Sequence, residues 1–199
     1  MDDTYSTRET LVQRLRNSYD EKSWEEFVKF YRGYIYTVVQ RSGLNYEDSQ
    51  DVTQDVVLRA WKALPQFEYK KDKCKFRTWL ARLWHNSICD HVKTKRAKLA
   101  KLKVEADNDL EEFAGSSAAE IEEIAEVEWK NYIADMAWEK VSRDFSDIAS
   151  QAFLLHGEDF SVREIAAKLD ISEEKVYVDR SRMRKALLKE ILRLDAQLG

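Results

Sequence analysis

Three carboxylates lie close together in the segment DSQDVTQD, at Asp48, Asp51 and Asp55. Side chains three and four residues apart are neighbours on a helix, so this spacing predicts an acidic helical face. Such a face can meet basic groups of a partner. It could also bind a metal ion, but a metal site needs ligands that converge from more than one turn of one helix. We therefore favour a docking surface over a metal site.

A second group with metal-binding side chains comes later in the chain, at His85, Cys89 and His91. Imidazole and thiolate are the usual zinc ligands in proteins. No Cys-x-x-Cys pair accompanies these residues, and neither group comes with a nucleophile–base pair or a phosphate-binding loop. We therefore predict no metal, no cofactor and no enzymatic activity.

Positive charge is concentrated in residues 75–103, KFRTWLARLWHNSICDHVKTKRAKLAKLK, although the whole chain has a net charge of -4. This stretch holds nine Lys or Arg and only one acid, Asp90. Cations bind phosphates and aromatic rings can stack on bases, so the stretch indicates contact with nucleic acid. However, Phe76 and Trp79 share a helical stripe with Leu83, which favours a core position for the two rings.

The surrounding pattern predicts helices throughout, because the chain has only one Pro and five Gly. A stripe from Trp24 to Val39 predicts one helix that ends at Gly43, and a second helix is expected over 47–64, stopped by Pro65. Residues 66–75 are then a loop, followed by the basic helix. With a short helix near 9–17, these elements form a predicted first domain over residues 1–96.

The next stretch, residues 97–127, is interpreted as a flexible linker. Residues 104–128 contain ten acids and no Lys or Arg. An acidic run is usually solvated, and the alternative is an arm that mimics nucleic acid and lies in a basic channel. We hypothesise that the free chain folds back on itself through this run and hides its DNA contacts.

The last segment, residues 128–199, is predicted to be a helical domain that ends in a helix-turn-helix. Ser161 and Glu164 form a capping box. Asp170 lies at the turn, where Asp tolerates the left-handed conformation, and Ser172 caps a longer cationic helix. A short turn between a short helix and a longer basic one is typical of a recognition helix in the major groove. An ordinary helical hairpin with a basic face is the alternative.

Both ends of the chain resemble one family. DVTQDVVLRAWKALPQF followed by FRTWLARLWHNSICDHVKTKRAK is similar to conserved region 2 of bacterial sigma factors. SVREIAAKLDISEEKVYVDRSRMRKAL is similar to their region 4. The pair of regions with only a linker between them resembles the extracytoplasmic-function (ECF) group. The resemblance implies an all-α fold of two helical domains joined by a flexible acidic linker.

The resemblance implies a transcription initiation factor that binds core RNA polymerase through the clamp helices and flap, and reads the promoter -10 and -35 elements. An anti-sigma factor or other regulator is a further partner that the family allows. The implied polymerase-binding residues are Asp48, Asp51, Gln54, Asp55 and Arg59. The implied -10 residues are Phe67, Lys73, Phe76, Arg77, Arg82, Asn86, Lys93 and Arg96, and the implied -35 residues are Lys175, Tyr177, Val178, Ser181, Arg182 and Lys185.

The chain departs from the family pattern at Tyr177 and Val178, where Arg or Lys and then Ser are common, and at Asp179 and Arg180. Tyr or Val can contact a thymine methyl, whereas Arg would favour guanine. Thr53 lies between the acids of the docking helix, and some relatives are thought to be switched by phosphorylation near it. Because the acids are already present here, we do not favour such a switch.

The main alternative is a conventional helix-turn-helix regulator that binds DNA without polymerase. The acidic face and the F-R-x-W-L helix argue against it. No apolar run approaches the roughly 20 residues that cross a bilayer, and the polar start MDDTYSTRET is unlike a secretory signal. We therefore expect no membrane insertion and a cytoplasmic location with reduced thiols.

Overall fold

The computed structural model describes residues 14–15, 20–67, 76–102 and 113–198, and the side chains of all of these except 98–102. Within these ranges the regular elements are all helices, which confirms the predicted all-α fold class. The short helix predicted near 9–17 lies outside the described residues, apart from Arg14 and Leu15. No helix in the described part of the chain is long and apolar enough to span a membrane.

The chain divides into two compact units, residues 1–130 with 198–199, and residues 131–197. The predicted linker, 97–127, lies on the first-unit side of this boundary. In the structure, residues 118–127 of that stretch are helical, because α6 runs over Ala118–Val141. The two units are described separately below.

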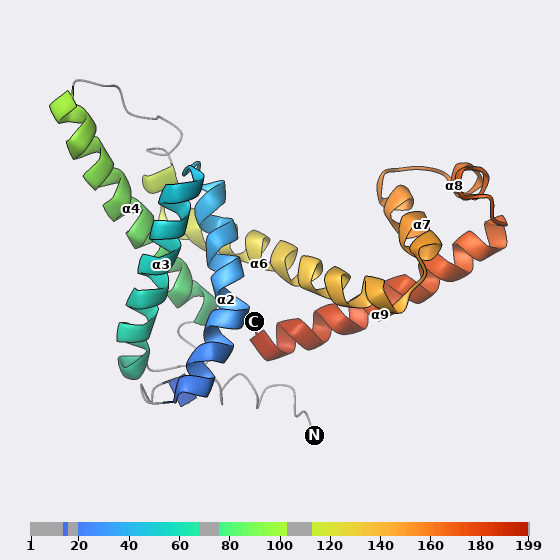
Figure 1. Ribbon diagram of the computed structural model, residues 1–199, viewed down its shortest axis with the longest axis horizontal. Coiled ribbons are helices and arrows are strands. Elements are labelled where there is room, and N and C mark those ends of the chain that lie inside the picture. The colour runs from blue at the N-terminus through green and yellow to red at the C-terminus, as the bar shows by residue number, and fades with distance from the viewer. Residues whose placement is uncertain (1–13, 16–19, 68–75, 103–112, 199) are drawn as a thin grey trace. The chain divides into compact units, whose positions relative to one another are not determined.

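The first unit is built on three helices that pack against one another (Figure 1). They are α2 (Glu21–Arg41), α3 (Tyr46–Ala63) and α4 (Phe76–Leu102), with a short 3-10 turn, Leu64–Gln66, after α3. Each start follows from its sequence. Asp20 caps α2 by accepting a hydrogen bond from the Ser23 amide at 3.1 Å, and Asn45 caps α3 through the Asp48 amide at 2.9 Å.

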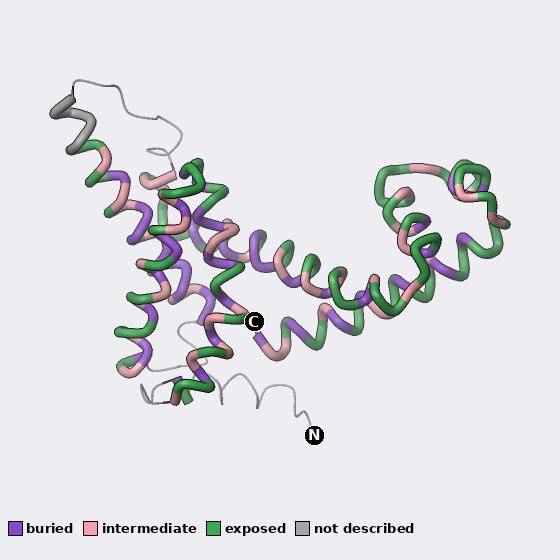
Figure 2. The backbone as a smooth tube through the Cα atoms, in the orientation of Figure 1, coloured by how far each residue is buried: buried purple, intermediate pink, exposed green. Residues whose placement is uncertain are grey.

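The core of the first unit matches the predicted stripes. Val52, Val56 and Ala60 of α3 are buried, as are Phe27 and Tyr31 of α2. The purple segments in Figure 2 mark these inward faces. Of the rings in the basic segment, Phe76 and Trp84 are fully buried. The ring of Trp79 is half-buried and lies 5.3 Å from that of Phe76, so the prediction that these rings serve the core is confirmed.

The first half of α6 also belongs to this unit. Ile121, Ala125 and Trp129 are buried at a spacing of four. The Trp129 ring lies 6.0 Å from the ring of Tyr31 and 5.3 Å from that of Tyr34. The Tyr34 hydroxyl donates to the Ala125 carbonyl at 3.1 Å, and burial raises the pKa of Tyr34. This acidic stretch is therefore anchored by an apolar stripe that the linker interpretation did not anticipate.

The second unit continues along α6 and contains a 3-10 turn, Ser142–Asp144, then α7 (Asp147–Gly157), α8 (Val162–Leu169) and α9 (Glu173–Leu198). Its inner cluster is formed by Ala152, Ile165, Ala166 and Val176. Ile171, in the turn between α8 and α9, packs against this cluster. Ile148, in the first turn of α7, is 41% exposed.

The α8–α9 turn has the local features that the sequence predicts. The Ser161 hydroxyl accepts from the Glu164 amide at 3.3 Å, and the Glu164 carboxylate accepts from the Ser161 amide at 2.9 Å. These are the two halves of a capping box. The hydrogen bonds from Ser161 hold the pKa of Glu164 below its ordinary value. Asp170 ends α8 in the left-handed conformation, with φ of 52°.

Candidate nucleic-acid interface and acidic face

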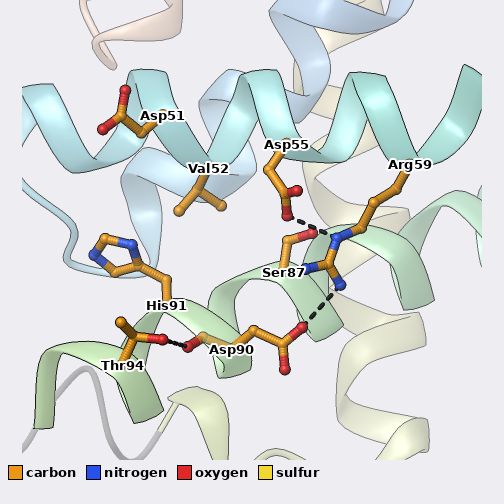
Figure 3. Close-up of a pocket in the computed structure, with 8 residues that line it drawn as sticks. All are labelled: Asp51, Val52, Asp55, Arg59, Ser87, Asp90, His91 and Thr94. Carbon is orange, nitrogen blue, oxygen red and sulfur yellow. Dashed lines mark hydrogen bonds and ion pairs between the residues drawn. The ribbon is translucent and has the colours of Figure 1, made fainter. Parts of the chain in front are cut away.

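The acidic face of α3 is turned partly to solvent and partly to α4. Asp51 and Gln54 are exposed. The carboxylate of Asp55 is paired with the Arg59 Nε at 2.7 Å, and Arg59 also reaches Asp90 on α4 at 2.8 Å (Figure 3). Arg59 is therefore held between two carboxylates from different helices, and Asp51 and Gln54 are the most available polar groups on this face.

Asp48 faces α4 rather than open solvent. Its carboxylate accepts a hydrogen bond from Lys95 Nζ at 2.9 Å and lies 3.4 Å from His91 Nε2. The hydrogen bond from Lys95, with the nearby His91, holds the pKa of Asp48 below its ordinary value. Among the polymerase-binding candidates, Asp48 thus has a clear structural role in joining α3 to α4.

A cavity of about 260 Å³ opens between α3 and α4 beside these residues. Figure 3 shows its lining, with the Arg59 guanidinium between Asp55 and Asp90. The Ser87 hydroxyl is buried there and has no hydrogen-bond partner within the described part of the chain. The lining is formed by Asp51, Val52, Asp55, Arg59, Ser87, Asp90, His91 and Thr94.

The three possible zinc ligands of α4 are not brought together. Cys89 Sγ lies 3.6 Å from the His85 ring, whereas His91 faces Asp48 of α3. Burial lowers the pKa of His85 and raises that of the Cys89 thiol, which favours neutral forms of both. Among the described residues, no group of three His, Cys, Asp or Glu side chains is placed to hold a metal ion.

The outer face of α4 carries the exposed polar residues of the basic segment. Arg82, Asn86, Lys93 and Arg96 are all exposed. Their spacings of four, seven and three residues keep them near one face of a helix. The structure thus brings these four -10 candidates together as one ridge, which can meet a phosphate backbone and the edge of a base.

Other -10 candidates are placed differently. Phe67 and Phe76 are buried in the core, with ring centroids 5.8 Å apart. Arg77 is only 9% exposed, and its guanidinium lies over the Trp129 ring, 5.1 Å from the centroid. Lys73 lies outside the described residues. The core thus covers both phenylalanines, and α6 covers Arg77.

Acids of α6 lie next to the arginines of α4. Glu126 is 3.6 Å from Arg77 Nη2, and Glu122 is 3.9 Å from Arg82 Nη2. Sequence reasoning did not assign these acids a partner. The spacing of Ile121, Ala125 and Trp129 could have indicated this packing, because it forms an apolar stripe that crosses the boundary drawn at residue 127.

The predicted -35 residues lie along the first half of α9. All six, from Lys175 to Lys185, are exposed. Val176, Asp179 and Met183, which are three and four residues apart on the opposite face of the helix, are buried. Lys175 Nζ lies 2.7 Å from the Asp179 carboxylate. Arg184, which sequence reasoning did not single out, is also exposed on this part of α9. A helical projection would have found it, seven residues after Tyr177.

The helices that carry the acidic face and the basic ridge are similar in sequence to known proteins. Residues 27–98, which include most of α2, all of α3 and most of α4, match the family model described as sigma-70 region 2. A curated relative, the ECF RNA polymerase sigma factor SigW of Bacillus subtilis (strain 168), is 27% identical over 77 residues, 39% of this chain and 40% of the relative. The chain thus aligns with about two fifths of the length of that relative.

A solved structure described as "Structure of CnrH in complex with the cytosolic domain of CnrY" covers 92% of this chain and 96% of the matched chain. It does so at 19% identity and a TM-score of 0.36. Residues 27–98, which form most of the α2–α4 bundle, are thus similar to sigma-70 region 2, and the chain resembles an ECF sigma factor over 77 residues.

Proposed function

We propose that this chain is a transcription initiation factor that binds bacterial core RNA polymerase and directs it to promoters. The observation that carries the proposal is the arrangement of the region 2 bundle. One helix, α3, presents Asp51 and Gln54, and the next, α4, presents the ridge of Arg82, Asn86 and Lys93. One bundle thus offers an acidic surface for a protein partner and a basic surface for DNA.

In this proposal, the exposed part of α3 docks on the polymerase clamp helices, with Arg59 and Asp55 completing the surface. The α4 ridge contacts the -10 element, where Asn86 can hydrogen-bond a base edge while the cations bind phosphates. The first half of α9 enters the major groove of the -35 element, and the second unit meets the polymerase flap. An anti-sigma factor is a further proposed partner.

Reconstitution with core polymerase tests the proposal. Transcription starts mapped genome-wide should share a motif with paired -35 and -10 elements that is absent with core polymerase alone. Asn86→Ala should then change the -10 preference, and Arg182→Ala the -35 preference. If both variants weaken every promoter alike, the roles are assigned wrongly, and if no motif emerges the proposed function fails.

The second candidate is a helix-turn-helix regulator that acts without polymerase, which the capped α8–α9 pair favours. It predicts tight, sequence-specific binding of duplex DNA by the chain alone, and no effect of charge reversal at Asp51. A sigma-type factor predicts weak duplex binding alone and strong binding in the holoenzyme, so the two candidates are separated by one binding assay with and without core polymerase.

A further inference from the structure

Two large apolar side chains are exposed next to each other near the start of α9. Tyr177 is 60% exposed and Val178 is 48% exposed. The residue before them, Val176, is fully buried and supplies the packing of this turn. The two exposed side chains share the outer surface of α9 with Ser181, so they lie on the part of the helix that the proposed function places in the major groove.

The cation that precedes the apolar pair is paired with a carboxylate, and the exposed Arg182 lies one turn further along α9. Lys175 Nζ lies 2.7 Å from Asp179, a carboxylate whose side chain is 10% exposed. Glu173 and Glu174 add negative charge in the first turn. Guanine is read by Arg or Lys donors that reach its O6 and N7 atoms. The first two turns of α9 instead present an aromatic ring and an isopropyl group.

We infer that α9 recognises thymine in the -35 element through the C5-methyl group, which Tyr177 and Val178 contact, while Lys185 binds a flanking phosphate. Among the four bases, only thymine presents a methyl group in the major groove. This inference rests on the proposed function, because it assumes that α9 reads the -35 element. It adds the chemistry by which this chain distinguishes one base from another.

Uracil substitution tests methyl recognition directly, because uracil differs from thymine only by that methyl group. The -35 element is first obtained by selection of random duplexes with the reconstituted holoenzyme. Each thymine of the selected element is then replaced by uracil, and initiation is measured. One or two positions should lose about fourfold in initiation, the effect of leaving a single methyl group without its apolar contact.

Variants of the two residues locate the contact. With Tyr177→Ala or Val178→Ala, the uracil effect should disappear at one position each, whereas Tyr177→Arg should shift the selected base toward guanine. Leu192→Ala is the matched control, because Leu192 is also an exposed apolar residue of α9, at 62%, but lies about four turns further along; it should keep the full uracil effect.

The outcomes separate the inference from the proposed function. If the holoenzyme selects no -35 element, the proposed function fails. If it selects an element and every uracil substitution leaves initiation unchanged, or if the element contains no thymine, methyl recognition is wrong while the proposed function stands.

An independent set of contacts in the first unit carries a second inference. Glu122 and Glu126 of α6 lie beside Arg82 and Arg77 of α4, and the apolar stripe that includes Trp129 holds α6 in this place. Further along α6, Glu128 accepts a hydrogen bond from Arg41 of α2 at 2.5 Å. The acids are thus positioned by packing as well as by charge.

We infer that the first half of α6 is an acidic cover, which buries Arg77 and places a carboxylate beside the exposed Arg82, so that these acids compete with DNA phosphates until polymerase binding displaces the cover. Carboxylates paired with an arginine occupy the place that a phosphate would take. This inference also rests on the proposed -10 role of α4. It names Glu122 and Glu126 as the acids of the 104–128 run that lie against the DNA-binding helix.

The test compares two double variants with the same change in net charge. Glu122→Gln with Glu126→Gln removes the covering charges but keeps the side-chain shapes and the apolar stripe. Glu123→Gln with Asp135→Asn removes two exposed acids of the same helix. The probe is a 20-nucleotide single strand, and affinity for the free, full-length chain is measured over a range of salt concentrations.

The covering pair of substitutions should raise affinity roughly fivefold above the control pair, since the exposed Arg82 and the largely buried Arg77 both lose a carboxylate neighbour. It should also steepen the slope of log affinity against log salt by about 1, as new phosphate contacts form. Equal affinity of the two double variants, including no binding by either, overturns the inference. Loss of start-site selection by the wild-type holoenzyme would instead count against the proposed function.

Discussion

Asp48 on α3 accepts a hydrogen bond from Lys95 Nζ on α4 at 2.9 Å, and this contact joins the two helices that carry the proposed polymerase and DNA surfaces. We predict that Asp48→Asn lowers the free energy of unfolding by about 0.5–1 kcal/mol at pH 7. The hydrogen bond from Lys95 and the proximity of His91 lower the pKa of Asp48 in the folded state. The stabilisation is therefore present above the ordinary pKa of 3.8 and is lost as the pH falls through the folded-state pKa.

Urea unfolding of both proteins at pH 7 and near pH 3 measures this difference. Glu47→Gln is the control, because Glu47 is an exposed acid in the same first turn of α3. A difference between wild type and Asp48→Asn that stays constant as the pH falls would contradict the assigned contact.

Asp51 and Asp55 should respond differently to charge reversal. Asp55 is paired with Arg59, whereas Asp51 is exposed. We predict that Asp51→Lys weakens binding to core polymerase about tenfold without changing the unfolding midpoint, because it alters charge complementarity alone. Asp55→Lys should weaken binding and also lower stability. Binding is measured by fluorescence anisotropy at two salt concentrations, and unchanged binding of both variants would exclude this face as the docking surface.

Trp129 should be as important to the first unit as a residue of the three-helix core. It is fully buried, its ring packs against Tyr31 and Tyr34, and the Arg77 guanidinium lies over it. We predict that Trp129→Ala destabilises this unit by about 3–5 kcal/mol. Trp61→Ala is the control, because Trp61 is 43% exposed, and it should cost much less. Thermal unfolding followed by circular dichroism gives both values, and equal losses would mean that the first half of α6 is not part of the core.

The packing of this acidic stretch marks the limit of what could be predicted from the sequence. The stripes of α2 and α3, the stop at Pro65 and the capping box at Ser161 were predicted correctly, because each depends on a local pattern of a few residues. Residues 118–127 were assigned to a flexible linker because their charge is typical of a solvated segment. Only three apolar side chains decide the packing, and one of them, Trp129, was counted with the next domain.

The candidate site was predictable to a similar degree. Helical spacing was sufficient to group Arg82, Asn86 and Lys93 on one exposed face. It could not indicate that Arg77, in the same segment, would be covered by Trp129, because that contact joins residues 52 positions apart in the chain. Long-range contacts of this kind depend on tertiary packing, which a local pattern does not contain.

The turn between α8 and α9 offers a prediction about the backbone. Asp170 has a φ of 52°, a conformation that is unfavourable for residues with a Cβ atom by about 1–2 kcal/mol. Asp170→Gly should therefore stabilise the second unit by roughly 0.5–1 kcal/mol. Asp147→Gly, at a helical position in the first turn of α7, should have the opposite sign. Thermal unfolding of the two variants checks this, and a loss of stability with Asp170→Gly would show that its side chain contributes more than its backbone costs.

Thr53 lies on α3 among the docking acids, but it is only 1% exposed, and its hydroxyl has no hydrogen-bond partner within the described part of the chain. A kinase could reach this hydroxyl only after local unfolding. We predict that Thr53→Glu lowers the free energy of unfolding by more than about 3 kcal/mol, because it buries an unpaired charge. Thr53→Val should be neutral or stabilising, since it removes an unsatisfied polar atom.

Ser49→Ala is the contrasting control, because the buried Ser49 hydroxyl donates to the Leu44 carbonyl at 3.2 Å and its loss should destabilise. Urea unfolding and holoenzyme transcription are measured together; a Thr53→Glu protein that folds with wild-type stability and initiates differently would restore phosphorylation at Thr53 as a switch.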